Sequence, residues 1–206
     1  MAIGKFITLE GMDGAGKSTH IPAILTILQA QGREVVSTRE PGGTPLGEQL
    51  RALLLHEEMH PETETLLMFA ARREHIAQVI LPALQRGAYV VSDRFTDATY
   101  AYQSGAKGVA EEKVLALESW VQGDLQPDLT LLFDVPTEVS VARLASARVP
   151  DKFERESAVF FERLRKAYLL RAQDNPRRFR VINSHQSLEV VQSDVHKVMT
   201  EFLQAQ

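Results

Sequence analysis

A glycine-rich segment near the N-terminus carries the residue types that bind phosphate. Residues 11–18 read Gly-Met-Asp-Gly-Ala-Gly-Lys-Ser, which fits the phosphate-loop pattern G-x4-G-K-[ST]. Glycines allow several backbone N–H groups to point at one anion, and they keep Cβ atoms out of its way. Lys17 can reach the β- and γ-phosphates, and the Ser18 hydroxyl can ligate Mg²⁺. The match predicts a nucleoside triphosphate site, with ATP contacts from Gly11, Met12, Asp13, Gly14, Ala15, Gly16, Lys17, Ser18 and Thr19.

A second group of charged residues follows two other strand patterns. Glu40 comes after the segment 34–38, and Asp93 and Arg94 come after the apolar run 88–92. In parallel α/β sheets, ligands collect at the carboxyl ends of strands. We therefore expect a second anion site opposite the loop, as a small-molecule kinase requires. Asp93 is the expected partner of Ser18 in holding Mg²⁺, and Asp134 is the alternative. Further cations available to this site are Arg39, Arg51, Arg72 and Arg73.

Two sets of residues on helical segments have the spacing of a base pocket. Phe69 and Arg73 are four residues apart and share a helix face, so a planar base could stack on the ring while the guanidinium donates to its edge. Periodicity alone favours the alternative, in which Phe69 is core and Arg73 is a solvated charge. Thr99, Tyr102 and Gln103 could line a nucleoside pocket, or Tyr102 could simply pack.

Alternating strand and helix patterns must position these residues. An α/β fold of three layers follows from this alternation, with a central parallel sheet of about five strands and helices on both faces. Pro61 is expected to end one helix, and the chain 1–206 is expected to be a single domain. The predicted strands are 6–10, 34–38, 88–92, 129–134 and 180–183. The predicted helices include 62–86, 96–104, 110–122 and 188–203, and one that begins at 139, breaks over 146–152 and resumes through Phe153.

Composition narrows the classes of protein and of partner. The chain has 206 residues, of which 24% are charged, and a net charge of −4, which excludes a collagen-like or highly charged disordered chain. A pI near 5.9 argues against a nucleic-acid coat protein, and no run of 18 apolar residues predicts a membrane helix. The N-terminus lacks a signal-peptide pattern, and the absence of cysteine excludes disulfides. We expect a cytoplasmic protein with neither nucleic acid nor membrane as partner.

Another motif belongs to a different class of enzyme. Residues 56–60 read His-Glu-Glu-Met-His, which fits the zinc-hydrolase pattern H-E-x-x-H. Pro61 follows at once, so His60 would lie in the last turn of its helix, and no third ligand is evident downstream. The phosphate-loop interpretation is therefore preferred. A non-catalytic nucleotide-binding regulator is a further alternative, although it would need no arginine-rich second pocket.

The order of the motifs resembles the bacterial thymidylate kinase family over essentially the whole chain. The resemblance is carried by Asp13-Gly-Ala-Gly-Lys-Ser-Thr19, Thr38-Arg-Glu-Pro-Gly-Gly-Thr44, Phe69-Ala-Ala-Arg-Arg73, Asp93-Arg-Phe95 and Thr99-Tyr-Ala-Tyr-Gln103. It implies a nucleoside-monophosphate-kinase fold that transfers the γ-phosphoryl group of ATP to dTMP with Mg²⁺, as a homodimer. Kinases of the same fold that act on UMP, CMP or AMP are the closest alternative.

The resemblance also implies roles for individual residues in binding the acceptor dTMP. Phe69 would stack on thymine, and Arg73 would bond its O4 edge. Thr99 and Gln103 would lie at the pyrimidine edge, and Tyr102 would lie near the sugar. The remaining acceptor contacts it implies are Asp13 near the 3′-OH, Arg51 and Arg94 at the 5′-phosphate, and Glu40 at the floor between the two phosphates.

The last implied element is a lid over the transferred phosphoryl group. Gly14-Ala15 is similar to those members of the family whose lid supplies arginines, which here would be Arg143 and Arg148 within residues 143–156. The usual lid pattern is altered, because Lys152 stands where an arginine is usual and cannot form a bidentate fork to phosphate. We expect Lys17, Arg94, Arg143 and Arg148 to be the catalytic cations of an in-line transfer without a covalent intermediate.

Overall fold

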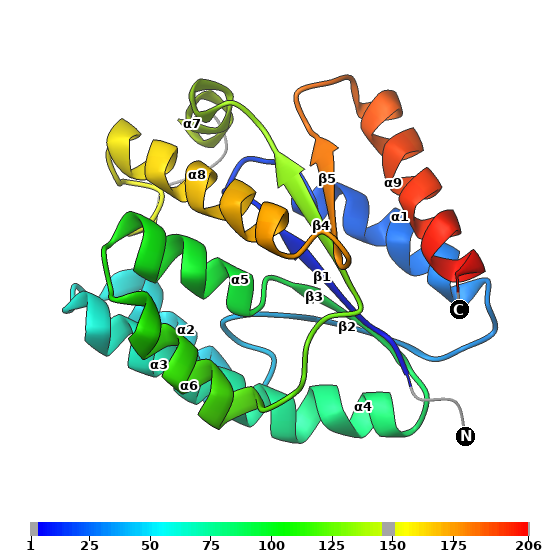
Figure 1. The fold of residues 1–206 in the computed structure, drawn as a ribbon, viewed down its shortest axis with the longest axis horizontal. Coiled ribbons are helices and arrows are strands. Elements are labelled where there is room, and N and C mark those ends of the chain that lie inside the picture. Colours follow the sequence, from blue (N-terminus) through cyan, green and yellow to red (C-terminus); the bar gives the residue numbers. More distant parts are fainter. Residues whose placement is uncertain (1–3, 146–150, 206) are drawn as a thin grey trace.

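A parallel sheet forms the middle of the molecule. The computed structural model describes residues 4–145 and 151–205. Within them the strands stand in the order β2-β3-β1-β4-β5, and every neighbouring pair is parallel (Figure 1). The predicted five-stranded parallel sheet is confirmed. The strands are β1 (Phe6–Glu10), β2 (Val35–Arg39), β3 (Tyr89–Asp93), β4 (Leu129–Asp134) and β5 (Phe179–Asn183).

Helices cover both faces of the sheet, as the alternating pattern predicts. Helices α1 and α9 pack together on one side, and α8 lies across β4 and β5 on the other (Figure 1). The helices are α1 (Lys17–Gln29), α2 (Pro45–His56), α3 (Pro61–His75), α4 (Leu81–Gln85), α5 (Thr96–Thr99), α6 (Glu111–Gln122), α7 (Thr137–Ala145), α8 (Ala158–Asp174) and α9 (Leu188–Gln204), with π-helical stretches η1 (Ile76–Ile80) and η2 (Tyr100–Ala106). Of the helices in the described residues, none has the length and apolar character needed to cross a bilayer.

Local sequence decides where several helices begin and end. Helix α2 ends at His56, and Pro61 takes the first position of α3, where its missing N–H costs nothing. Helix α8 begins later than the prediction that it resumes through Phe153. The Ser157 hydroxyl accepts a hydrogen bond from the backbone N–H of Phe160 and caps the helix there, so that Phe153 lies outside it.

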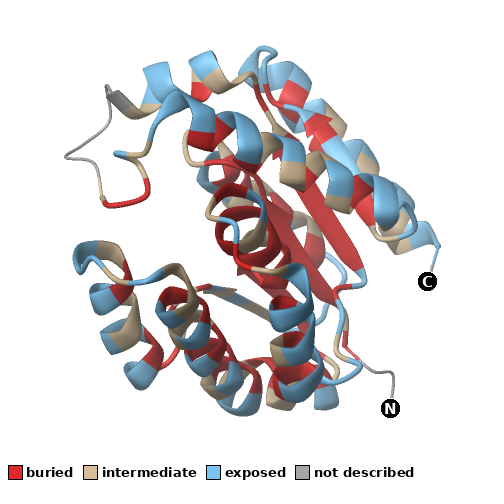
Figure 2. Cartoon of the chain, turned by 60° about the vertical axis from the view of Figure 1, so that its left-hand side comes forward, coloured by how far each residue is buried: buried red, intermediate tan, exposed pale blue. Residues whose placement is uncertain are grey.

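Strand β1 places alternate side chains in two core clusters. Phe6 belongs to the cluster that contains Ile76, whereas Ile7 and Leu9 belong to the cluster that contains Ile24 of α1. This period of two is the pleat of the strand. Figure 2 shows the buried sheet lying beneath helices whose outer surfaces are exposed. Because β1 is buried along its whole length, the loop that follows it starts from a fixed point.

Candidate active site

The phosphate loop joins β1 to α1 in the conformation that its glycines allow. Gly14 and Gly16 have φ of 77° and 91°, a region that residues with side chains seldom adopt. At Gly11 an added Cβ would lie 2.4 Å from a carbonyl oxygen of β4. Lys17 begins α1, and its Nζ donates to the carbonyl oxygens of Gly11 and Met12 at 2.9 Å each. The loop therefore curls around the start of α1, where free N–H groups and the helix dipole favour an anion.

A cleft of about 670 Å³ opens in front of this loop. Arg143 of α7 reaches across it, and its guanidinium donates to the carbonyl oxygens of Gly14 and Ser184 at 3.2 Å each. Met12 and Ala15 turn their side chains into the core instead. The predicted site residues that line the cleft are Asp13, Gly14, Gly16, Lys17, Ser18, Thr19, Glu40, Arg51, Asp93, Arg94 and Arg143. Arg148 lies outside the described residues.

A second, narrower cavity of about 90 Å³ lies beside the cleft. Asp13, Glu40, Arg51 and Arg94 line both, so the two spaces meet at these four residues. The other residues that line the cavity are Pro41, Leu55, Met68, Arg72, Phe95, Ala98, Thr99, Tyr102, Gln103, Asp151 and Phe153.

Arg94 is fixed at the junction of the two cavities. It is the one described non-glycine residue with positive φ, at 70°. Its Nη1 donates to the Gly11 carbonyl and to the Tyr168 hydroxyl at 2.9 Å, and its Nη2 donates to Asp13 at 2.7 Å and to the Tyr102 hydroxyl at 3.0 Å. Burial opposes ionisation of Asp13, but Arg94 and Lys17 outweigh it and hold the pKa of this carboxyl well below its usual range. The junction thus holds a cation whose position is fixed by four hydrogen bonds.

A buried hydrogen-bonded chain supports the floor of the second cavity. Glu40 accepts from Arg72 Nε at 2.7 Å and is 2.9 Å from His75 Nδ1, while His75 Nε2 is 2.6 Å from the Thr38 hydroxyl. Arg72 also donates through Nη2 to Thr99 at 3.0 Å. Its Nη1 is buried and has no hydrogen-bond partner among the described residues. Since an unpaired buried donor is costly, Nη1 is suited to an acceptor atom of a ligand in the cavity.

Sequence and structure comparisons agree on one family. A family model described as thymidylate kinase matches residues 9–195. Proteins named thymidylate kinase from Methylobacillus flagellatus and Nitrosomonas europaea are 70% and 60% identical, covering 97% and 98% of this chain and 98% and 95% of their own lengths. The chain belongs to the thymidylate kinase family. A solved thymidylate kinase from Ehrlichia chaffeensis superposes with a TM-score of 0.77 at 33% identity, covering 95% of this chain and 98% of that one.

Members of the thymidylate kinase family phosphorylate dTMP to dTDP with ATP, and the two adjoining spaces suit a reaction with two nucleotide substrates. The cleft carries the phosphate loop, whereas the narrower cavity has an apolar wall that includes Met68 and Phe95. The sequence predictions of fold class and activity are confirmed.

Phe69 and Arg73, the residues predicted to contact the base, do not line the narrower cavity. Phe69 is 1% exposed and lies in the core, and Arg73 donates to the carbonyl oxygen of Val121 at 2.9 Å. Met68 and Arg72 line the cavity in their stead. One residue along an α-helix is a rotation of about 100°, so Met68 and Arg72 face the cavity while Phe69 and Arg73, at the same four-residue spacing, do not.

The other acceptor residues predicted for the kinase do line the cavity. Thr99 accepts from Arg72, the Tyr102 hydroxyl donates to Asp13 at 2.9 Å, and the Gln103 amide donates to the buried Glu64 at 2.9 Å. Tyr102 and Gln103 lie in the π-helical stretch η2, and such stretches are frequent at functional sites.

The structure separates the two candidates for the metal-holding carboxylate. Asp134 binds Arg165 through both oxygens, at 2.7 and 2.8 Å. Asp93 lines the cleft with Ser18, and its buried Oδ1 has no partner among the described residues. A hydroxyl and a carboxylate are oxygen ligands of the kind that Mg²⁺ prefers, so this pair fits the cation.

The H-E-x-x-H motif does not form one helical face. His56 is the last residue of α2, whereas His60 precedes α3 and accepts from the backbone N–H of Glu62 through Nδ1, at 3.3 Å. The described residues hold no group of three or more His, Asp or Glu side chains arranged for a metal. The segment between α2 and α3, from Glu57 to His60, breaks the one-turn helical spacing that the two histidines would need to bind zinc.

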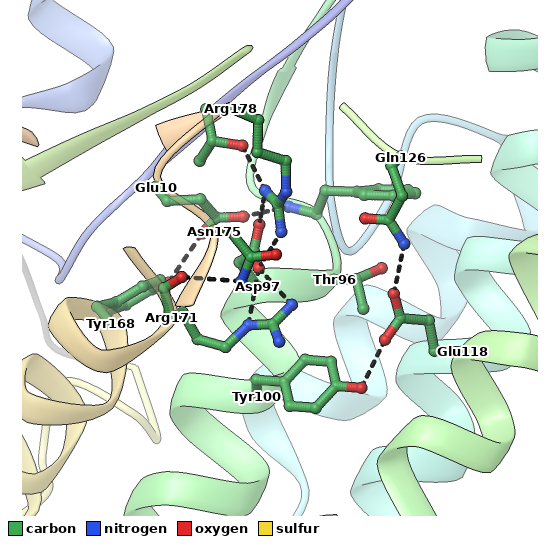
Figure 3. A network of polar contacts seen from close by, with 12 residues as sticks. Glu10, Thr96, Asp97, Tyr100, Glu118, Gln126, Tyr168, Arg171, Asn175 and Arg178 are labelled. Carbon is green, nitrogen blue, oxygen red and sulfur yellow. Dashed lines mark hydrogen bonds and ion pairs between the residues drawn. The ribbon is translucent and has the colours of Figure 1, made fainter. Parts of the chain in front are cut away.

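A polar layer lies directly beneath the phosphate loop. Glu10, at the end of β1, accepts from the backbone N–H of Phe95 at 2.7 Å and from the Tyr168 hydroxyl at 2.9 Å. Burial, followed by the charge of Asp97, raises the pKa of Glu10 to about 8. Asp97 is itself held by Arg171 of α8 and by Arg178, which precedes β5 (Figure 3). The layer therefore helps to fix Arg94, because Glu10 bonds both the backbone of the next residue, Phe95, and the Tyr168 hydroxyl that accepts from Arg94.

The described end of the predicted lid is bound to the body of the enzyme. Lys152 is 5% exposed, and its Nζ lies 2.8 Å from Glu64 and donates to the Glu57 carbonyl at 2.9 Å. Its neighbours Asp151 and Phe153 line the second cavity. Lys152 therefore anchors this segment rather than facing the phosphoryl group. Sequence reasoning missed this anchor and the place of Met68 on the cavity wall, and it named Arg72 only as one of several cations available to the second site. Each of these placements depends on contacts between distant elements.

Proposed function

We propose that the cleft is the ATP site, that the narrower cavity takes the thymine and sugar of dTMP, and that transfer occurs where they meet. The observation that carries this assignment is the set of four residues shared by the two spaces, Asp13, Glu40, Arg51 and Arg94. A γ-phosphate on the loop and an acceptor phosphate beside Arg94 would lie next to each other, as in-line transfer requires.

On the donor side, the backbone N–H groups of residues 11–19 and Lys17 hold the phosphates, and Arg143 lies above the loop. Ser18 and Asp93 hold Mg²⁺, which neutralises charge on the phosphates when bound. We further propose that residues 143–156 form a lid within a single domain and that Arg148 is the cation it brings. No general base is needed, because the acceptor phosphate is anionic at neutral pH.

On the acceptor side, Met68 packs on the face of the base and Arg72 Nη1 donates to a ring carbonyl. Thr99 and Gln103 face the pyrimidine edge, and Tyr102 lies at the sugar. Asp13 lies near the 3′-OH, Glu40 lies at the floor, and Arg51 and Arg94 bind the 5′-phosphate. The support for Arg72 is its unpaired, buried donor on the cavity wall.

The test compares two neighbouring arginines over a panel of dTMP, dUMP, UMP, CMP and AMP, with ADP formation as the signal. Arg72→Met removes the proposed donor to the base together with the bonds to Glu40 and Thr99. One hydrogen bond from a charged donor is worth about 1.5–3 kcal/mol, so kcat/KM for dTMP should fall by at least roughly 10- to 100-fold. Arg73→Met, which removes a guanidinium bonded to Val121, should stay close to wild type. Equal losses in both variants, at equal stability, would refute the assignment of the cavity.

We also propose that the enzyme is a homodimer located in the cytoplasm, where ATP and dTMP are available. Helices α3 and α6 pack together and expose Leu66, Leu115 and Trp120, the last at 83%. Tryptophan is among the side chains enriched in interfaces between subunits. Sedimentation velocity tests the proposal, since Trp120→Lys should shift the protein toward the monomer and a monomeric wild type would contradict it.

A further inference from the structure

Glu64 is a fully buried carboxylate outside the proposed catalytic machinery. It lies on α3 with 0% exposure, and side chains from other elements meet it. Its Oε1 accepts from Gln103 Nε2 at 2.9 Å, its Oε2 accepts from Lys107 Nζ at 2.9 Å, and Oε2 also forms an ion pair with Lys152 Nζ at 2.8 Å. Two lysines offset its charge, and the remaining partner is a residue that lines the second cavity.

This contact decides which end of the Gln103 amide faces the cavity. A carboxylate in an ion pair only accepts hydrogen bonds, so Gln103 must turn its NH₂ toward Glu64. The amide carbonyl Oε1 is then directed away from Glu64. Gln103 lines the cavity, and no donor in the described part of the chain bonds to this oxygen. The wall therefore offers a hydrogen-bond acceptor at this position.

Arg72 lines the same cavity and supplies a hydrogen-bond donor, to set against the Gln103 acceptor. Arg72 Nη1 is buried without a partner in the described residues, and Nη2 of the same guanidinium is bonded to Thr99. Thr99 is four residues before Gln103 on a continuous helical segment, so the two side chains lie on one side of it. The cavity thus presents one donor and one acceptor along a single edge.

We infer that Glu64 is a specificity-determining positioning residue that sets this donor–acceptor polarity through Gln103. The inference rests on the proposed placement of the base in this cavity. Thymine and uracil offer a carbonyl next to N3–H, which complements the wall. Cytosine offers an amino group next to an unprotonated N3, which would set donor against donor and acceptor against acceptor. Unpaired buried groups of this kind are heavily penalised, so the arrangement rejects cytosine.

The experiment replaces Glu64 by glutamine and measures kcat/KM for dTMP and dCMP in the full-length enzyme. The amide introduced by Glu64→Gln can donate as well as accept, so Gln103 can flip and present its NH₂ to the cavity. For this variant we expect the dTMP-to-dCMP ratio to fall roughly tenfold or more, mainly through KM, because a flip makes and breaks single hydrogen bonds.

Two further variants separate specificity from folding. Lys107→Met removes one of the two lysines from the buried Glu64 and should lower stability, but it leaves Lys152 and the bond to Gln103, so the ratio should stay within about threefold of wild type. Gln103→Leu removes the acceptor and leaves Glu64, so it should lower the ratio even if Glu64→Gln folds poorly. An unchanged ratio in Glu64→Gln, or an equal fall in Lys107→Met, would overturn the inference. If Arg72→Met binds dTMP normally, the placement of the base fails instead.

Discussion

Replacing Arg94 by methionine removes the cation at the junction of the two cavities while keeping most of its bulk. The guanidinium makes four hydrogen bonds, to Gly11, Tyr168, Asp13 and Tyr102, and its side chain is 14% exposed. Methionine can form none of them. The change therefore withdraws a fixed positive charge from the proposed path of the phosphoryl group, and it leaves Asp13 with Tyr102 as its remaining partner among these.

The expected size of the effect follows from these contacts. Breaking a buried ion pair costs about 3–5 kcal/mol of stability, and the lower end applies because Asp13 is 32% exposed and keeps its bond to Tyr102. Removing a preorganised charge partner of a transition state costs roughly 10²–10³ in kcat. Arg94→Met should thus lose about 3 kcal/mol of unfolding free energy and about 10²–10³ in turnover.

Urea denaturation and steady-state ADP formation with dTMP measure the two effects separately. Arg94→Lys is the control, because it restores the charge but cannot bond both Asp13 and the Gly11 carbonyl in the same fork. It should recover about tenfold in kcat over Arg94→Met, the scale of one charge-assisted hydrogen bond. If Arg94→Met keeps kcat within about threefold of wild type while losing stability as expected, Arg94 is structural, and the junction is not where transfer occurs.

Three more predictions follow from the loop, the lid and the buried layer. Lys17→Ala should lower kcat by about 10²–10³, and full activity would contradict the loop assignment. Arg148→Ala should lower kcat by roughly 10³–10⁵, as loss of an arginine finger does, and near-normal turnover would transfer that role to Arg143. Glu10 has a folded pKa of about 8 against an ordinary 4.5, so its contribution to stability is complete below pH 4.5 and is lost as pH rises through 8. Urea titrations should show Glu10→Gln flattening a decline of several kcal/mol between about pH 5 and 8, and an unchanged slope would refute that pKa.

The phosphate loop and the positions of the strands were accessible from sequence because their signals are local, whereas the order of the strands in the sheet was not predicted. Gly14, Gly16 and Lys17 act within a few residues of one another, and the apolar runs of β1, β3 and β4 are bounded by turns. The start of α8 was misplaced because the polar residues after Phe153 gave no indication that Ser157 would be the cap.

The residues of α3 that line the second cavity could not be predicted from any local pattern. Phe69 with Arg73 and Met68 with Arg72 have the same four-residue spacing, so periodicity cannot choose between them. Arg72 is drawn inward by Glu40, 32 positions away, and this contact fixes which face of α3 turns to the cavity. Aromatic character favoured Phe69 as the stacking residue, yet its size and apolarity placed it in the core. The ion pair between Arg72 and Glu40, rather than local spacing, therefore determines which pair of residues faces the cavity.

Trp120, exposed on α6, makes the chain convenient to observe by fluorescence. It is the single tryptophan among 206 residues, so all indole emission reports on one place, far along the chain from the phosphate loop. Subunit association through α6 should shift that emission to shorter wavelength and shield it from iodide, whereas filling the cleft alone should leave it nearly unchanged. Because the sequence contains no cysteine, one thiol introduced near residue 154 could carry a dye, and energy transfer from Trp120 would then report in real time on any movement of the proposed lid.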